Sequence, residues 1–436
     1  MKKTNRSEKQ LQNKIGKDDL ILILEGIVIG ALAGLTTIFY RFCILWSETG
    51  LFCILKFIQG NILAITLWFL ALIFMGVFVS RMIRLDSMAG GSGIPQVFCE
   101  IGDDLDPCWW RIILIKFIGG SVSILGGLSL GRSGPSIQLG AMAAKGYTRA
   151  RNFDRAKEIH FLSCGAGAGL AATFNAPLAG LMFVMEELRH TFDRSLLTAG
   201  LAATLSADFT SKLFFGTSSL FSFSTQAMPL HYYWLLIVLG IILGLAGAGY
   251  NAAILKTQAL FQCFKKVPEE LRISIVFIFS GVLSLFLPQV LAGGQRMIAM
   301  LQQEQPALTL IALLLAVKFI FSALSFASGA PGGIIFPLLV LGAYIGALAG
   351  SAATCFLPLS SELFPQFVIL GIAGLFVGIM RTPLTGILLI TELTGSLHSM
   401  LDVSIVCILA YAVANLTGSK PICTSLTQNM LKKSQK

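Results

Sequence analysis

Charged residues are scarce in this chain. Asp, Glu, Lys and Arg together make up 12% of its 436 residues, whereas they make up about a quarter of a typical soluble domain. Hydrophobic residues make up 55%, and the mean hydropathy is +0.79. The shortage of charge excludes a water-soluble globular protein, and the high hydrophobic content excludes a disordered chain.

Patterns of metal-ligating and catalytic residues are also missing. The nine cysteines show no Cys-x-x-Cys spacing, and the four histidines lie far apart. The apolar segments contain no Ser/His/Asp, His-Glu-x-x-His or paired-aspartate arrangement. We therefore expect no metal site, no disulfide framework, no cofactor and no enzymatic activity.

Long apolar runs are present instead. Roughly ten to twelve segments of about 20 residues have the length of a helix that spans a bilayer, and several are interrupted by Gly or Pro. Clear examples are 20–40, 61–80, 232–255 and 273–291. These runs predict an all-α integral membrane protein with many spans.

Lys and Arg outnumber Asp and Glu by 32 to 22, which gives a net charge of +10. The basic residues gather at positions 2–17, 145–157, 256–272 and 432–436. Basic residues flank membrane helices on the cytoplasmic side, so we place all four clusters and both termini in the cytoplasm. The chain is then a multi-pass protein of the plasma membrane. Its positive charge is explained by the lipid bilayer as partner, and we expect no binding of nucleic acid.

The chain contains an internal repeat. When it is shifted by 202 residues, the segment 116–141 aligns without a gap to 318–343, and ten of these 26 positions are identical. The repeat predicts two homologous halves, 20–215 and 230–416, between a basic segment 1–19 and a C-terminal segment 417–436. Duplication of this kind is typical of transporters and channels, with the two repeats either parallel or inverted.

Three Gly/Pro clusters interrupt the apolar sequence. They are Gly90-Gly-Ser-Gly-Ile-Pro95, Gly131-Arg-Ser-Gly-Pro135 and Gly329-Ala-Pro-Gly-Gly-Ile-Ile-Phe-Pro337. Irregular backbone at membrane depth is tolerated where it is buried in protein or lines a water-filled path. A helix that begins there offers free N–H groups and a partial positive charge, and several such starts aimed at one point make an anion site. The hydroxyl of Ser92 and the amides of Ile334 and Ile335 would add donors.

These clusters resemble the three signature motifs of the CLC chloride channels and proton/chloride exchangers. The resemblance extends to Asn175-Ala-Pro-Leu-Ala-Gly180, Glu186-Glu187 and Thr417-Gly-Ser-Lys-Pro421, and covers about residues 20–426. It implies an inverted repeat whose broken helices meet at a midplane anion site, and a homodimer with one pore per subunit. Chloride would be carried, and bromide and nitrate would also pass. The implied anion-binding positions are Ser92, Gly93, Ile94, Ile334, Ile335 and Cys423.

The chain departs from the family at two pore positions. The second motif of the family usually carries a glutamate that closes the outer end of the pore when charged and carries the proton in exchangers. Here that position is Ser133, followed by Gly134, and a hydroxyl neither titrates near neutral pH nor carries charge. We therefore expect passive, proton-independent chloride conduction. At the inner end, Cys423 stands where the family commonly has a tyrosine.

Glu187 supports a different function, proton/chloride exchange. It falls where exchangers keep an internal proton-accepting glutamate, so a proton/chloride antiporter with an unusual relay stays open, as does a non-transporting receptor or scaffold. The competing interpretation is that Glu186 and Glu187 pair with Arg189 and Arg194, and that Glu392, the repeat partner of Glu186, caps or pairs in the same way. Lys116 and Lys318 stand at equivalent positions in apolar segments of the two repeats. Their ammonium groups would either snorkel to the membrane interface or enrich anions at a pore mouth.

Overall fold

The computed structural model describes residues 4–217, 221, 223, 227–263, 268–303, 305–358 and 360–434. Within these ranges the regular structure is helical, and extended backbone pairs at a single isolated bridge. The α-helices are α1 (Thr4–Ile58), α2 (Ile62–Leu85), α3 (Ile94–Ile101), α4 (Trp109–Leu125), α5 (Ser133–Ala150), α6 (Arg155–Phe174), α7 (Pro177–Phe183), α8 (Arg194–Phe215), α9 (Tyr233–Cys263), α10 (Glu269–Phe286), α11 (Gln295–Gln303), α12 (Leu308–Ala327), α13 (Ile335–Phe356), α14 (Phe364–Met380), α15 (Pro383–Thr394), α16 (Met400–Leu416) and α17 (Ile422–Ser434). A π-helical turn, η2 (Val184–Arg189), follows α7.

The predicted all-α membrane architecture is confirmed, although apolar runs and spanning helices do not correspond one to one. Among the described residues, five helices are long and apolar enough to cross a bilayer: α1, α2, α9, α12 and α13. The run 273–291 is helical only to Phe286 and breaks before Pro288, because proline ends an α-helix. Shorter apolar helices, such as α14, α15 and α16, fill the rest of the membrane layer.

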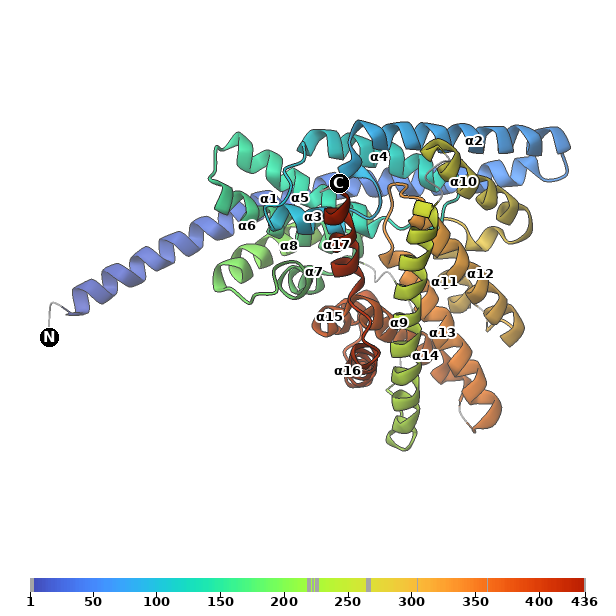
Figure 1. The fold of residues 1–436 in the computed structure, drawn as a ribbon. Helices are drawn as coiled ribbons and strands as arrows, with labels where there is room; N and C mark the ends of the chain where they lie inside the picture. Colours follow the sequence, from blue (N-terminus) through green and yellow to red (C-terminus); the bar gives the residue numbers. More distant parts are fainter. Residues whose placement is uncertain are drawn as a thin grey trace.

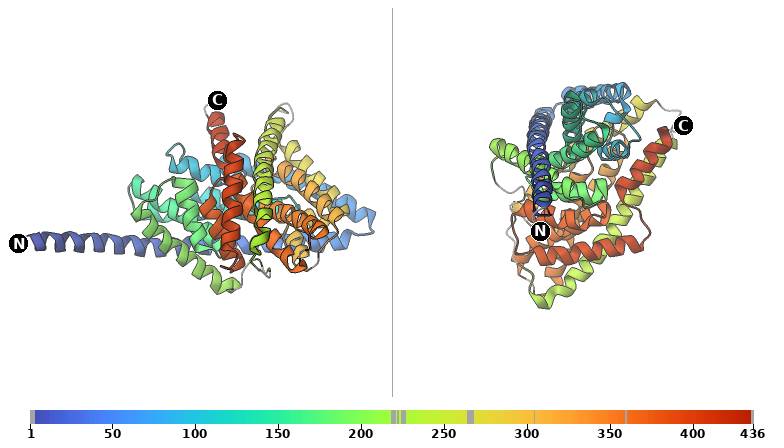
Figure 2. Two further views of the ribbon diagram at one scale, coloured as in Figure 1. Left: turned by 90° about the horizontal axis from the view of Figure 1, so that it is seen from below. Right: turned by 90° about the vertical axis from the view of Figure 1, so that its left-hand side faces the viewer.

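The two repeats pack against each other. The first repeat, coloured blue to green in Figure 1, meets the second, coloured yellow to red, through α2 with α10 and through α7 with α15. The long α1 contributes to the first repeat with its C-terminal part, while its first turns project away from the body (Figure 2).

The repeats are inverted about a local two-fold axis. Gly131 and Gly333, which are 202 positions apart, form an isolated antiparallel bridge. The N–H of each donates to the carbonyl oxygen of the other, at 2.7 and 2.6 Å. Two such bonds between equivalent residues relate the two segments by a half-turn, as an inverted repeat requires.

Close helix pairs recur in both halves. A Cβ built at Gly140 of α5 would lie 2.2 Å from the carbonyl oxygen of Gly165 in α6, and one at Gly342 of α13 would lie 2.6 Å from that of Gly371 in α14. Small residues allow helix backbones to approach closely within a membrane. The glycines of these segments therefore serve helix packing, and they hold α5 and α13 rigidly at the centre of the molecule.

Candidate anion site

Three helices begin deep inside the protein, at the Gly/Pro clusters. Helix α3 starts at Ile94, α5 at Ser133 and α13 at Ile335, and each has a proline within its first three residues. A proline there costs little, because the first N–H groups of a helix have no intrahelical partner. No side chain caps any of these three helix starts. Their free N–H groups are therefore available to a ligand.

The three helix starts meet at one place. A Cβ built at Gly134 would lie 2.5 Å from Oγ of Ser92, and one built at Gly333 would lie 2.6 Å from the backbone N of Gly134. The loops are tied together by the Gly91 N–H donating to Gly329 O at 2.9 Å and the Gly332 N–H donating to Gly91 O at 3.1 Å. The structure thus brings together the three segments that the sequence pointed to.

Polar atoms at this meeting point lack protein partners. The Oγ atoms of Ser92 and Ser133 are both buried and accept or donate no hydrogen bond within the described residues. Ile334 and Ile335 are buried beside them at the start of α13. A buried hydroxyl without a partner costs about 1–3 kcal/mol, which an anion that accepts the hydrogen bond would recover.

Two other helix starts are closed by the protein itself. Glu392 of α15 accepts from the N–H groups of Leu178 and Ala179 at 3.0 and 2.9 Å and so caps α7. Glu186 accepts from Leu384 N, Thr385 N and Thr385 Oγ1 at 3.2, 2.8 and 2.9 Å and so caps α15. We name these two contacts the cross-caps. They correct the expectation that Glu186 pairs with arginine, and they distinguish α7 and α15 from α3, α5 and α13, whose starts no side chain caps.

The two buried lysines neither snorkel to the membrane interface nor enrich anions at a pore mouth, contrary to expectation. Lys116 and Lys318 are both 0% exposed, so neither reaches an interface or a pore mouth. The Lys116 Nζ donates to Gly91 O at 2.7 Å, and the Lys318 Nζ donates to the carbonyl oxygens of Val290 and Ala292 at 2.8 and 3.0 Å. Each lysine therefore fixes a loop of its own repeat, and Lys116 fixes the loop that carries Ser92.

Glu187 is not paired with arginine, contrary to the structural interpretation. It is 3% exposed, and its Oε1 has no hydrogen-bond partner among the described residues. Arg194 instead pairs with Asp19 at 3.1 Å. The thiol of Cys423, at the start of α17, lies beside the Glu187 carboxyl group. The structure thus joins two residues that the sequence singled out separately.

A cavity of about 500 Å³ leads to Ser92 from one face of the molecule. Its polar wall includes the amide side chains of Gln96 (α3), Gln258 and Gln262 (α9) and Asn429 (α17), and also the carboxylate of Glu269 (α10). Amide groups of this kind can hydrogen-bond to an anion or to its hydration water without a net charge. The cavity gives a hydrated ion a route to Ser92 and the start of α3.

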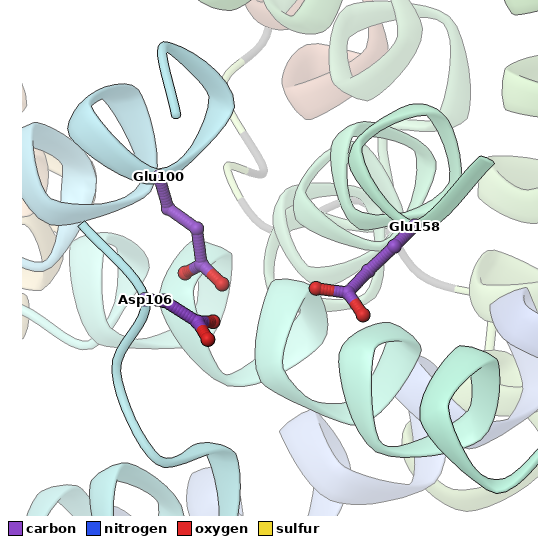
Figure 3. A group of neighbouring side chains, drawn as sticks. All are labelled: Glu100, Asp106 and Glu158. Carbon is purple, nitrogen blue, oxygen red and sulfur yellow. The ribbon is translucent and has the colours of Figure 1, made fainter. Parts of the chain in front are cut away.

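An ion-pair network anchors the far end of α3. The carboxylates of Glu100, Asp106 and Glu158 point toward a common space (Figure 3). Lys145, which is 0% exposed, pairs with Glu100 and Asp106, while Arg149 and Arg155 bind the other carboxylates. In the loop, the hydrogen bond from Arg149 lowers the pKa of Asp106 to about 2. The cations neutralise the three acids, and the network holds α3 in line with the site.

The comparisons with known proteins agree with this geometry. Residues 71–415 match the family described as "Voltage gated chloride channel". A relative named H(+)/Cl(-) exchange transporter ClcA, from Salmonella arizonae, is 32% identical over 96% of this chain and 90% of its own length. The protein of the same name from Salmonella schwarzengrund is 31% identical over the same shares.

Solved structures give the same result. A slow cyanobacterial Cl⁻/H⁺ antiporter, 26% identical, superposes with a TM-score of 0.89 over 95% of this chain and 99% of its own. A CLC-type fluoride/proton antiporter, 23% identical, has a TM-score of 0.78 over 91% and 95% and is alike in fold. From the family match, the relatives and the inverted arrangement of uncapped helix starts, we conclude that the chain belongs to the voltage gated chloride channel (CLC) family.

Proposed function

We propose that this chain carries chloride across the membrane through the meeting point of α3, α5 and α13. The anion-binding groups are the Ser92 hydroxyl, the backbone of Gly93 and Ile94, and the amides of Ile334 and Ile335. Cys423 lines the inner end of the path. The uncapped helix starts and the orphaned Ser92 hydroxyl support this assignment, since they offer partial charges that bind an anion and still release it.

We further propose that transport is passive conduction. The observation that carries this is Ser133, which begins α5 beside Gly134 with its hydroxyl buried and no partner. A hydroxyl at this position neither competes with chloride by charge nor carries a proton at physiological pH. Anions would then move down their electrochemical gradient past Ser92 and Ser133.

Proton/chloride exchange is the second candidate, and two observations favour it. The relatives are named exchangers. Glu187 is buried beside the Cys423 thiol, and its Oε1 has no hydrogen-bond partner among the described residues; an ionisable group inside a membrane protein is functional by default. Exchange through Glu187 would need another protonatable group toward the opposite face, because position 133 cannot supply one.

The reversal potential of the purified protein in planar bilayers separates the two candidates. A fixed chloride gradient is held while a pH gradient is imposed and then removed. A potential that stays at the chloride equilibrium value supports passive conduction. A shift with the proton gradient supports exchange, and currents equal to those of protein-free bilayers would overturn both.

Four finer assignments belong to the same proposal. The chain forms a homodimer with one pore in each subunit, and bromide and nitrate pass with chloride. It lies in the plasma membrane with both termini in the cytoplasm, because the basic clusters follow the cytoplasmic side. The units are the segment 1–19, the repeats 20–215 and 230–416, and the segment 417–436.

A further inference from the structure

Glu48 is a carboxylate that the proposed conduction path leaves unused. It lies on the membrane-spanning part of α1, where it is partly buried. Among the described residues, no cation lies within 4.0 Å of it to form an ion pair. A partly buried acid without a direct partner is energetically costly in a membrane helix, and such residues are usually functional.

Glu48 lines a second cavity, which lies between α1 and α11. This cavity measures about 410 Å³. Its wall combines Glu48 with two cations, Lys56 of α1 and Arg296 of α11. The guanidinium of Arg296 stacks 3.2 Å over the ring of Phe52. Phe52 therefore fixes Arg296 in place, which leaves its charge facing the cavity.

Glu48 also lies within electrostatic reach of a residue next to the proposed gate position. Arg132 and Lys318 lie close enough for their charges to act on its carboxylate, as does Arg296. Arg132 is buried, its Nε has no hydrogen-bond partner, and it directly precedes Ser133. Lys318 packs against Gly294, whose Cβ would meet its Nζ at 3.1 Å, and Gly294 directly precedes the cavity residue Gln295. The cavity and the outer end of the pore thus share one group of charges.

We propose that Glu48 is the protonatable group that controls anion entry from the cavity between α1 and α11. When ionised, it offsets the positive charge of Lys56 and Arg296, which line the cavity, and repels incoming anions. When protonated, it leaves the cavity strongly positive, and a cleft lined by one sign of charge concentrates counter-ions and raises their rate of entry. This inference rests on the proposed anion path, and it places the missing titratable group on a different helix from Ser133.

The sign of the pH dependence follows from this arrangement. Besides the Cys53 thiol, the groups around Glu48 are Lys56 of α1 and Arg296 of α11, which line the cavity, and Arg132 ahead of α5 and Lys318 on α12, which are buried near it. All four are cations, so neutralising Glu48 makes the net charge of the cavity more positive. Chloride flux should therefore rise as the pH falls on the face that holds the C-terminal end of α1, and not as it falls on the other face.

The test measures chloride current in planar bilayers while the pH of one chamber is lowered from 7.5 to 4.0. We expect the wild type to gain about tenfold on one face only. Glu48→Gln should conduct at the high level at both pH values, and Glu48→Asp should restore the pH response. Glu270→Gln is the matched control, because Glu270 pairs with the exposed Arg84 outside the cavity.

Arg296→Gln is a second test variant, in which Glu48 itself is unchanged. It should lower the flux at every pH and keep the pH response. A conducting Glu48→Gln protein with the wild-type pH response would overturn the role of Glu48 and leave the proposed chloride path standing. A wild-type protein without chloride current would instead overturn the path itself.

Discussion

Gly131 and Gly333 hold the two halves of the pore together through a pair of backbone hydrogen bonds of 2.7 and 2.6 Å. The bonds lie just ahead of α5 and α13, so the two helix starts cannot move apart without breaking both. The two repeats therefore set the geometry of the anion site jointly, and no single segment sets it alone.

Gly333→Ala should abolish chloride binding measured by isothermal titration calorimetry. The added Cβ would lie 2.6 Å from the backbone N of Gly134, which cannot shift without moving α5. Gly249→Ala is the control, because a Cβ there meets nothing within 4 Å and alanine is favoured over glycine in a helix by about 1 kcal/mol. Equal binding by both variants would show that the close approach is unimportant.

Ser133→Glu should slow chloride flux at pH 7.5 and restore it as the pH falls. The ionised carboxylate competes with chloride at the start of α5, and protonation removes that charge. Ser133→Gln is similar in size but does not titrate, so it should show no pH response at this position. If the two variants have the same pH profile in vesicle flux assays, position 133 does not face the anion path.

Lys116→Met should weaken chloride binding about tenfold or more, because a lost buried hydrogen bond costs about 1–3 kcal/mol. The substitution removes the bond that fixes Gly91 O, and with it the position of Ser92. Lys318→Met is equally buried but fixes Val290 and Ala292. We expect its effect on the chloride dissociation constant to be smaller, and the reverse order would contradict the role given to Lys116.

Lys145→Met should destabilise the protein by about 3–5 kcal/mol, because it leaves the buried Glu100 carboxylate without its cation. The measurement is denaturant unfolding in detergent. Arg151→Met is the control, since Arg151 is exposed and its pair with Glu25 spans 3.4 Å; an exposed pair contributes about 0–1 kcal/mol. Similar losses of unfolding free energy in both variants would contradict the proposal that the network anchors α3.

Each cross-cap should contribute similarly to stability. Glu186→Ala and Glu392→Ala each leave two helix N–H groups without acceptors, and loss of an N-terminal cap costs about 0.5–2 kcal/mol. Glu270→Ala, on the surface of α10, serves as the reference. Melting temperatures in detergent should fall for the first two variants and stay near the wild-type value for the third.

Much of the fold could be predicted from the sequence because it follows from length and period. The apolar runs predicted membrane helices, and the match of Lys116 with Lys318 predicted the repeat that the bridge at Gly131 and Gly333 displays. The helix breaks at Pro95, Pro135 and Pro337 were also visible, since proline and glycine act locally. The choice between parallel and inverted repeats needed the resemblance, because spacing alone carries no direction.

Partners that are distant in the chain could not be predicted. Glu186 reaches Thr385 across 199 residues, and nothing in the local sequence distinguishes that contact from a pair with Arg189. The apolar helix around Lys116 predicts a side chain that snorkels to the interface. In the structure its ammonium group instead donates to the carbonyl oxygen of Gly91, in another segment. The surroundings of Glu48 are equally hidden in the sequence, since α11 completes the wall of its cavity.

The cross-caps have a consequence for the order in which the protein is made. Leu178 leaves the ribosome 214 residues before Glu392, which is roughly 10–40 s at ordinary rates of translation. During that interval the carboxylate that accepts from Leu178 and Ala179 in the folded protein has not yet been made. The first half therefore completes its own packing only after most of the second half is synthesised, and a chain interrupted before residue 392 never gains the cap on α7.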